Sequence, residues 1–219
     1  MNSSYLQAHR QARRARRRWL LLILAAIIGL IGYYGPWVPH KAAGLTVIGL
    51  DLAEYVKFLP DVMAGRVVFR RELFYLPLCA ASVSAALIAG RRGALPVWLR
   101  TLLALASIPC AAAMLPPAWS PAVLQLPEFR VQVIAILVCW LLVPGVLLTR
   151  YLPARLILAL IALLDLAAAL VPTWGFLQVH PGIEALYRQT LPLGWGFWVN
   201  AGSFLVGAVY ACAEMLRPS

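Results

Sequence analysis

The stretch "RARRRWLLLILAAIIGLIGYY", residues 14–34, decides the fold class of this chain. Four arginines stand before an apolar run that begins at Trp19. A membrane-spanning helix needs about 20 largely apolar residues, and a positively charged flank keeps its end on the cytoplasmic side. The run ends in "IGYYGPW", which lacks the small-residue cleavage site of a signal peptide. We therefore interpret this stretch as an uncleaved membrane anchor.

The composition of the whole chain also indicates that much of it lies in a lipid bilayer. Of the 219 residues, 63% are hydrophobic and 12% are charged. Soluble domains have roughly 45–50% apolar and about 25% charged residues. Burial in a core cannot absorb the excess, because a chain of this size must still cover a surface that faces water. The sequence therefore predicts a polytopic integral membrane protein.

The formal net charge of +11 is concentrated rather than spread. A basic chain can bind nucleic acid, but here six arginines precede the first apolar run: Arg10, Arg13, Arg14, Arg16, Arg17 and Arg18. This placement favours contact with anionic lipid head groups over nucleic-acid binding. Membrane-protein subunits are the other partners that we expect. The four cysteines lie in apolar runs without a close pair, so they predict no disulfide framework.

Six apolar segments are long enough to span a bilayer. They cover residues 18–34, 73–90, 95–115, 131–148, 155–174 and 195–216. The predicted fold is an all-α membrane protein, a bundle of six transmembrane helices with an amphipathic interfacial helix after the first span. It forms a single domain over residues 19–216, preceded by a basic cytoplasmic tail over residues 1–18.

The distribution of lysine and arginine predicts the orientation. With the N-terminus inside, the inner segments hold twelve of these residues and the outer segments hold seven. Both termini are therefore predicted in the cytoplasm, with the protein in the inner (plasma) membrane. The inner loops "GRRGA" and "TRYLPAR" are too short to hold a soluble domain. Five tryptophans fall at the predicted outer ends, as in an aromatic belt: Trp37, Trp119, Trp174, Trp195 and Trp198.

The segment "GLTVIGLDLAEYVKFLPDVMA", residues 44–64, predicts an amphipathic helix lying flat at the outer interface. Apolar and charged residues recur at helical spacing on separate faces: Leu52, Val56, Leu59 and Met63 against Asp51, Glu54, Lys57 and Asp61. The register also predicts Glu54–Lys57 and Lys57–Asp61 ion pairs. Pro60 should kink or end the helix, because proline lacks the backbone donor.

Polar residues of the predicted outer face form a candidate site. Its members are His40, Asp51, Glu54, His180 and Glu184. Two imidazoles with carboxylates on one membrane face can bind zinc or respond to acid pH. Their spacing matches no strong metal motif, so neither a metal nor a cofactor is predicted. The amphipathic segment is then a lid over the helix ends, or a gate or docking surface.

A second candidate lies within the bilayer. Asp165 stands in "LILALIALLDLAAALVP", where a carboxylate is costly and should face other helices. The sixth segment carries a stripe of small and polar residues that suits close helix packing: Asn200, Ser203, Gly207, Ala211 and Glu214. The sequence therefore predicts an intramembrane polar cluster of Asp165, Asn200 and Ser203. It serves either as an interhelical hydrogen bond or as a proton or cation relay.

Catalytic motifs are missing from the sequence. It contains no H-E-x-x-H helix, no G-x-S-x-G elbow and no Walker or dinucleotide-binding motif, and no catalytic residue is predicted. The favoured function is a non-catalytic subunit of a membrane complex or a small transporter. The alternative is a membrane-embedded enzyme or metal-binding protein with an outer-face site around His40 and His180.

Overall fold

The computed structural model of the chain describes residues 3–67, 70–93, 95–116, 119–149 and 151–217. Over these residues the chain is mostly helical, with one two-stranded sheet. The long helices are α1 (Ser3–Tyr33), α4 (Leu76–Ala89), α5 (Val97–Ala112), α7 (Arg130–Thr149), α8 (Ala154–Tyr187) and α9 (Trp195–Leu216). The predicted all-α class is confirmed apart from the small sheet.

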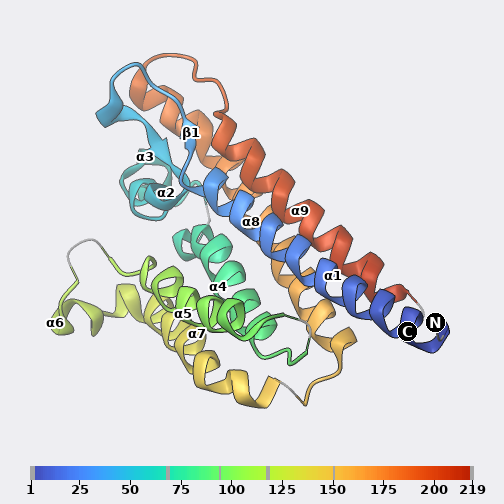
Figure 1. Cartoon of the computed structure of the whole chain (residues 1–219). Helices are drawn as coiled ribbons and strands as arrows, with labels where there is room; N and C mark the ends of the chain where they lie inside the picture. Colours follow the sequence, from blue (N-terminus) through green and yellow to red (C-terminus); the bar gives the residue numbers. More distant parts are fainter. Residues whose placement is uncertain (1–2, 68–69, 94, 117–118, 150, 218–219) are drawn as a thin grey trace.

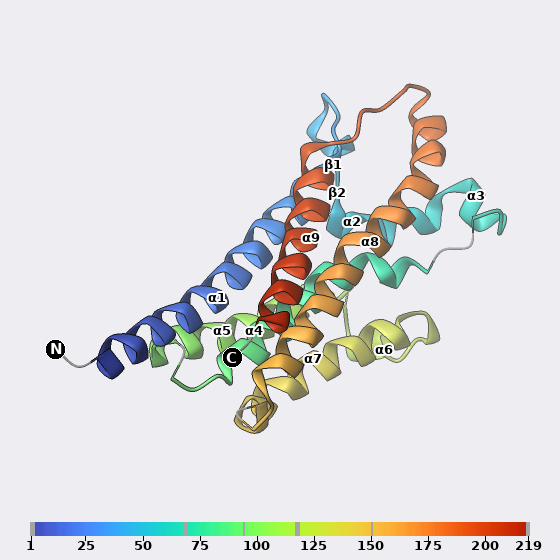
Figure 2. The ribbon, with the colours of Figure 1, turned by 90° about the vertical axis from the view of Figure 1, so that its right-hand side faces the viewer.

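The long helices form two groups (Figure 1). Helices α1, α8 and α9 pack together, and α4, α5 and α7 pack together beside them. Helix α4 joins the groups, because it contacts α1 and α8 as well as α5 and α7. Both chain termini lie at one end of the α1–α8–α9 group, here called the terminal end. The opposite end, called the hairpin end, carries strands β1 (Pro36–Val38) and β2 (Val47–Ile48) (Figure 2).

Four of the described helical segments are long and apolar enough to cross a membrane: Arg71–Ala89, Pro127–Val146, Ala154–Tyr187 and Trp195–Leu216. Large apolar side chains such as Leu141 and Leu163 stand exposed along them. Exposed apolar surface on this scale indicates a membrane protein. Helix α5 has only 16 residues, and the basic first half of α1 shortens its apolar part. Six spans therefore remain a prediction.

Helix α8 is longer than the sequence indicated. We predicted a fifth span ending at Trp174, but the helix continues through Pro172 and Pro181 to Tyr187. Its buried residues Phe176, Val179 and Ile183 recur at helical spacing and pack in the core of the hairpin end. This packing holds the extension helical. At 1.5 Å per residue its 34 residues span about 51 Å, more than the roughly 30 Å hydrocarbon core.

The predicted continuous helix over residues 44–64 is wrong. The segment breaks into five short elements: the 3-10 turn η1 (Ala43–Leu45), β2, α2 (Gly49–Tyr55), the 3-10 turn η2 (Val56–Phe58) and α3 (Pro60–Met63). The β-branched pair in β2 instead joins β1 in an antiparallel sheet. Leu59 is extended with ψ 132°, because a residue before proline avoids the helical conformation. Pro60 then begins α3, where a missing backbone donor costs nothing.

The apolar face of this segment is nevertheless buried as predicted. Leu52, Val56 and Leu59 are at most 2% exposed, whereas Met63 is 75% exposed. They pack in a core that also contains Trp37, which is fully buried rather than part of an aromatic belt. The Trp37 ring lies edge-on to Phe176 at 5.2 Å and donates from Nε1 to the Gly32 carbonyl. Position at an interface with the bilayer stays a prediction.

Short elements lead into the second helix group. The 3-10 turn η3 (Arg71–Tyr75) precedes α4, and α6 (Pro121–Leu124) with the turn η4 (Pro127–Phe129) precedes α7. Ser120 caps α6 by accepting a hydrogen bond from the Val123 amide. The proline-rich segment that leads into α7 is therefore partly helical.

Helices α1 and α9 cross with their backbones in contact near the hairpin end. A Cβ on Gly196 would lie 2.5 Å from the Gly35 carbonyl carbon and 2.6 Å from the Gly32 oxygen. A Cβ on Gly32 would meet the backbone of Asn200. Only glycine permits this approach, and such small residues are what bring membrane helices together.

We expect Gly196→Leu to lower the free energy of unfolding by about 1–3 kcal/mol or more, because the added side chain must displace backbone. Thermal unfolding of the protein in detergent would measure this. Gly145→Leu in α7 is the matched control, since a Cβ there meets no atom within 4 Å. Equal unfolding temperatures for the two variants would contradict the crossing.

Candidate functional site

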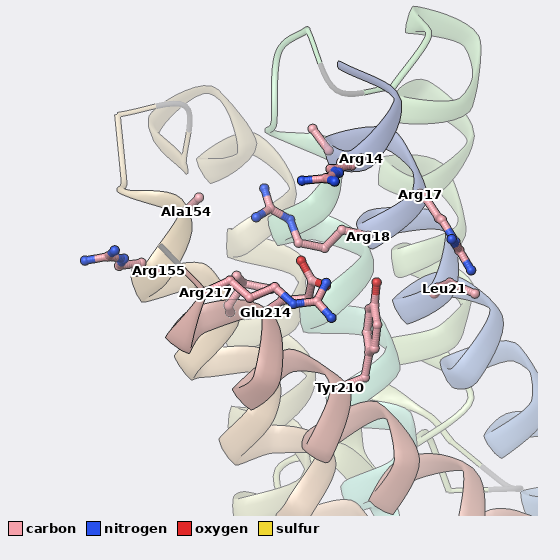
Figure 3. Close-up of a pocket in the computed structure, with 11 residues that line it drawn as sticks. Arg14, Arg17, Arg18, Leu21, Ala154, Arg155, Tyr210, Glu214 and Arg217 are labelled. Atoms are coloured by element: carbon pink, nitrogen blue, oxygen red, sulfur yellow. The ribbon is translucent and has the colours of Figure 1, made fainter. Parts of the chain in front are cut away.

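A cluster of arginines surrounds a cavity of about 800 Å³ at the terminal end, between α1, α8 and α9 (Figure 3). We call it the arginine cavity. Five arginines line it together with one tyrosine and one glutamate: Arg14, Arg17, Arg18, Arg155, Arg217, Tyr210 and Glu214. Leu21, Leu158 and two alanines complete the wall on the side toward the apolar helices.

The helical register of α1 selects which arginines reach the cavity. Arg14 and Arg18 are four residues apart and therefore share a face, while Arg13 and Arg16 do not line the cavity. In Figure 3, Arg14 and Arg18 lie opposite Arg217, and the guanidinium of Arg155 points away from the others. The lining arginines therefore come from α1, from the start of α8 and from the residue that follows α9, which are distant in the sequence.

The charge in the arginine cavity is largely uncompensated. Glu214 is its one acidic lining residue and pairs with Arg217. Within the described part of the chain, no acidic side chain pairs with Arg14 or Arg18. The Arg18 Nε atom is also buried without an acceptor there. Burial, and then repulsion from Arg18, lower the pKa of the neighbouring Arg91. The site is thus short of negative charge.

Such a site can bind anions but offers little acid–base chemistry. Guanidinium groups stay protonated in proteins and present planar pairs of donors that match phosphate oxygens. The Tyr210 hydroxyl adds a neutral donor on the α9 wall (Figure 3). The arrangement therefore suits a phosphate group that is held rather than transformed.

The five predicted outer-face residues do not form one site. His40 and Asp51 line a cavity of about 530 Å³ with Tyr55 and Tyr187. The His40 ring lies 5.6 Å from the Tyr187 ring, and its Nδ1 accepts a hydrogen bond from the Ala42 amide. Burial and a hydrogen bond with Tyr187 raise the pKa of Tyr55 above its ordinary value. The Tyr55 phenol therefore stays neutral at physiological pH.

His180 and Glu184 lie together on the α8 extension. His180 Nδ1 is 4.0 Å from Glu184 Oε2, and Glu184 Oε1 accepts a hydrogen bond from the Leu191 amide at 2.8 Å. The His180 ring packs edge-on against Phe176 at 5.4 Å. Among the described residues, no three His, Cys, Asp or Glu side chains gather as metal ligands would. The geometry thus gives the alternative metal site no support.

Glu54 belongs to a network of ion pairs, which we call the hairpin-end network. It pairs with Arg71 at 2.8 Å and with Lys57 at 2.7 Å. Glu128, just before α7, pairs with the same two cations at 3.1 and 3.4 Å. The predicted Glu54–Lys57 pair is confirmed, but Lys57–Asp61 is wrong, because Asp61 pairs with Arg66. The network ties α2 to the segments that precede α4 and α7, and it explains Glu54 structurally.

The predicted intramembrane cluster is divided between two contacts. Asp165 is 3% exposed and faces α9 as expected, but its Oδ2 lies against Gly207, one turn beyond Ser203. Asn200 is fully buried and donates from Nδ2 to the Gly29 carbonyl of α1 at 3.1 Å. Ser203 lines a groove between α1 and α9. The three residues therefore share a helix interface without forming one site.

The sequence analysis assigned the N-terminal arginines to a membrane flank and to contact with anionic lipid head groups, but it did not predict the cavity. The spacing of Arg14 and Arg18 was visible, but their approach to Arg217 depends on α1 lying along α9. Comparison of the chain with protein-family models, curated proteins and solved structures gave no match. The geometry of the cavity therefore carries the functional argument.

We expect Asp165→Asn to keep the unfolding temperature within a few degrees of the wild type, because asparagine has the same shape and retains hydrogen-bonding groups. Asp165→Leu should lower it, since Asp165 Oδ2 already lies 2.6 Å from the Cβ position of Gly207 and a bulkier side chain overpacks the interface. Thermal unfolding in detergent measures both. A stabilising leucine would show that residue 165 faces lipid instead.

Proposed function

We propose that the chain is a multi-pass protein of the inner (plasma) membrane, with both termini in the cytoplasm. In this proposal it acts as a non-catalytic membrane subunit that holds an anionic lipid head group in the arginine cavity. The carrying observation is the set of uncompensated guanidinium groups between α1, α8 and α9. Basic pockets between membrane helices on the cytoplasmic side are where phospholipid head groups bind.

The distribution of charge supports the orientation. Six of the eight acidic residues lie toward the hairpin end: Asp51, Glu54, Asp61, Glu72, Glu128 and Glu184. They pair there with cations such as Arg71 and Arg66. The arginines beside the chain termini have one acid, Glu214, in their cavity. The positive-inside rule counts lysine and arginine rather than net charge, and the predicted inner segments hold twelve of these residues against seven in the outer segments.

Six spans and an interfacial hairpin end belong to the same proposal. The second half of α1 exposes Leu24, Ile27 and Ile31, and α5 exposes Leu102 and Leu105. Lipid would cover these side chains if both helices cross. Helix α5 is about 24 Å long, so it would cross with local thinning of the bilayer.

A transporter is the second candidate function. It is favoured by Asp165, whose Oδ1 is buried among α8, α9 and α1 without a partner in the described structure. Buried intramembrane acids mark proton and ion pathways. Asp165→Asn separates the two candidates, because it would leave lipid binding intact and abolish a titration-dependent transport activity.

The orientation predicts which introduced cysteines react with an impermeant reagent in intact cells. In a chain whose four native cysteines are replaced, cysteines at Ser120 and Gln189 should be labelled, and one at Gly93 should not. Permeabilised cells provide the control, because all three positions should then react. Labelling of Gly93 alone in intact cells would reverse the assigned topology.

The arginine cavity predicts a charge-selective response to lipid. Added phosphatidylglycerol should raise the unfolding temperature of the detergent-solubilised protein by several degrees more than phosphatidylcholine does. Replacing Arg14 and Arg18 together by Gln should remove most of this difference, because bound ligand stabilises only the folded state. Replacing Arg13 and Arg16 by Gln is the matched control, with the same change in charge outside the cavity. Equal losses in both pairs would refute the site.

A further inference from the structure

An apolar groove of about 340 Å³ runs between α1 and α9. From α1 it is lined by Leu21, Leu24, Ala25 and Ile28, and from α9 by Gly202, Ser203, Val206, Gly207 and Tyr210. Toward the hairpin end the helices close on each other at Gly32 and Gly196, where their backbones touch. The groove is therefore closed at that end and continues toward the terminal end.

The groove and the arginine cavity are continuous. Leu21 and Tyr210 line both. The groove follows α9 from Gly202 to Tyr210, which at 1.5 Å per residue is about 12 Å. One leaflet of the hydrocarbon core is about 15 Å thick. The combined feature thus has a cationic pocket at one end and an apolar channel nearly one leaflet long.

We infer that the arginine cavity and the α1–α9 groove form one site for a single anionic phospholipid. Its phosphate lies among the arginines and one acyl chain lies in the groove. The inference rests on the proposed function. It adds that the groove binds an acyl chain of the same lipid. It also assigns Gly202 and Gly207 a role, because side chains larger than glycine there would narrow the groove.

The shape and charge of the site distinguish this occupant from others. Free phosphate would satisfy the arginines but leave the apolar groove exposed. A helix from a partner, about 10–12 Å across with its side chains, is too wide for a groove of this volume and brings no anion to the cavity. A zwitterionic lipid would bring a positively charged ammonium group, beside its phosphate, into a pocket that already has an excess of positive charge.

The experiment measures affinities of the purified, delipidated full chain in detergent. The probes are dioleoyl phosphatidate, dioleoyl phosphatidylcholine, glycerol 3-phosphate and inorganic phosphate. Gly202→Leu is the test variant, because a Cβ there meets no atom within 4 Å and the side chain enters the groove. Gly145→Leu on α7 is the matched control. Val206→Trp, at a 64% exposed groove position, is the second test variant.

We expect Gly202→Leu to weaken phosphatidate binding at least tenfold and to leave glycerol 3-phosphate binding within twofold of the wild type. The Gly145→Leu control should bind all four probes like the wild type. Phosphatidylcholine and inorganic phosphate should bind the wild type at least tenfold more weakly than phosphatidate. If Gly202→Leu does not fold, Val206→Trp should give the same pattern.

Each other outcome overturns one statement. Unchanged phosphatidate affinity in a folded groove variant refutes the acyl-chain site, while the loss seen on replacing Arg14 and Arg18 would keep the proposed function. Equal affinity of the wild type for phosphatidate and inorganic phosphate would make the ligand a free anion. Equal affinity for phosphatidate and phosphatidylcholine would refute the role of the arginines and with it the proposed function.

Discussion

The backbone contact of α1 with α9 is the constraint on which the rest of the structure depends. Glycines at positions 32, 35 and 196 let the two helices touch near the hairpin end. The same contact brings Trp37 under Phe176 and Phe197, so the hairpin end has an aromatic core. Further along the two helices, toward the terminal end, the groove and then the arginine cavity lie between them. One short contact thus determines both a closed end and an open one.

The sequence predicted the helical class, the approximate position of every long helix and the buried face of residues 44–64. These features follow from local periodicity, which a sequence displays directly. The sequence did not predict the features that depend on contacts between segments distant in the chain. Strand β2 forms because residues 36–38 lie beside it, and α8 continues past two prolines because its extension packs in the hairpin-end core. Asp165 meets Gly207 rather than Ser203, because the sequence alone predicts which residues of two neighbouring helices face each other only to within a helical turn.

The arginine cavity could not be predicted from the sequence for a related reason. The histidines and carboxylates of the predicted outer face are conspicuous by type, yet the structure uses several of them for support: Glu54 in the hairpin-end network, Glu184 on the Leu191 amide and His40 against Tyr187. The N-terminal arginines were predicted to mark topology and to contact lipid head groups, without a defined site. Their further significance depends on the absence of balancing acids, and that absence is a property of how α1, α8 and α9 meet.

The two ends of the molecule therefore differ in their response to an electric field. At the hairpin end cations and acids are interleaved, so a field exerts little net force on it. The terminal end carries the excess positive charge, and in the orientation that we propose the negative interior of an energised cell attracts it. Moving each charge across 100 mV costs about 2.3 kcal/mol. In the proposed orientation the membrane potential therefore stabilises the cytoplasmic position of the terminal end. This stabilisation increases as the cell is energised and decreases when the gradient collapses.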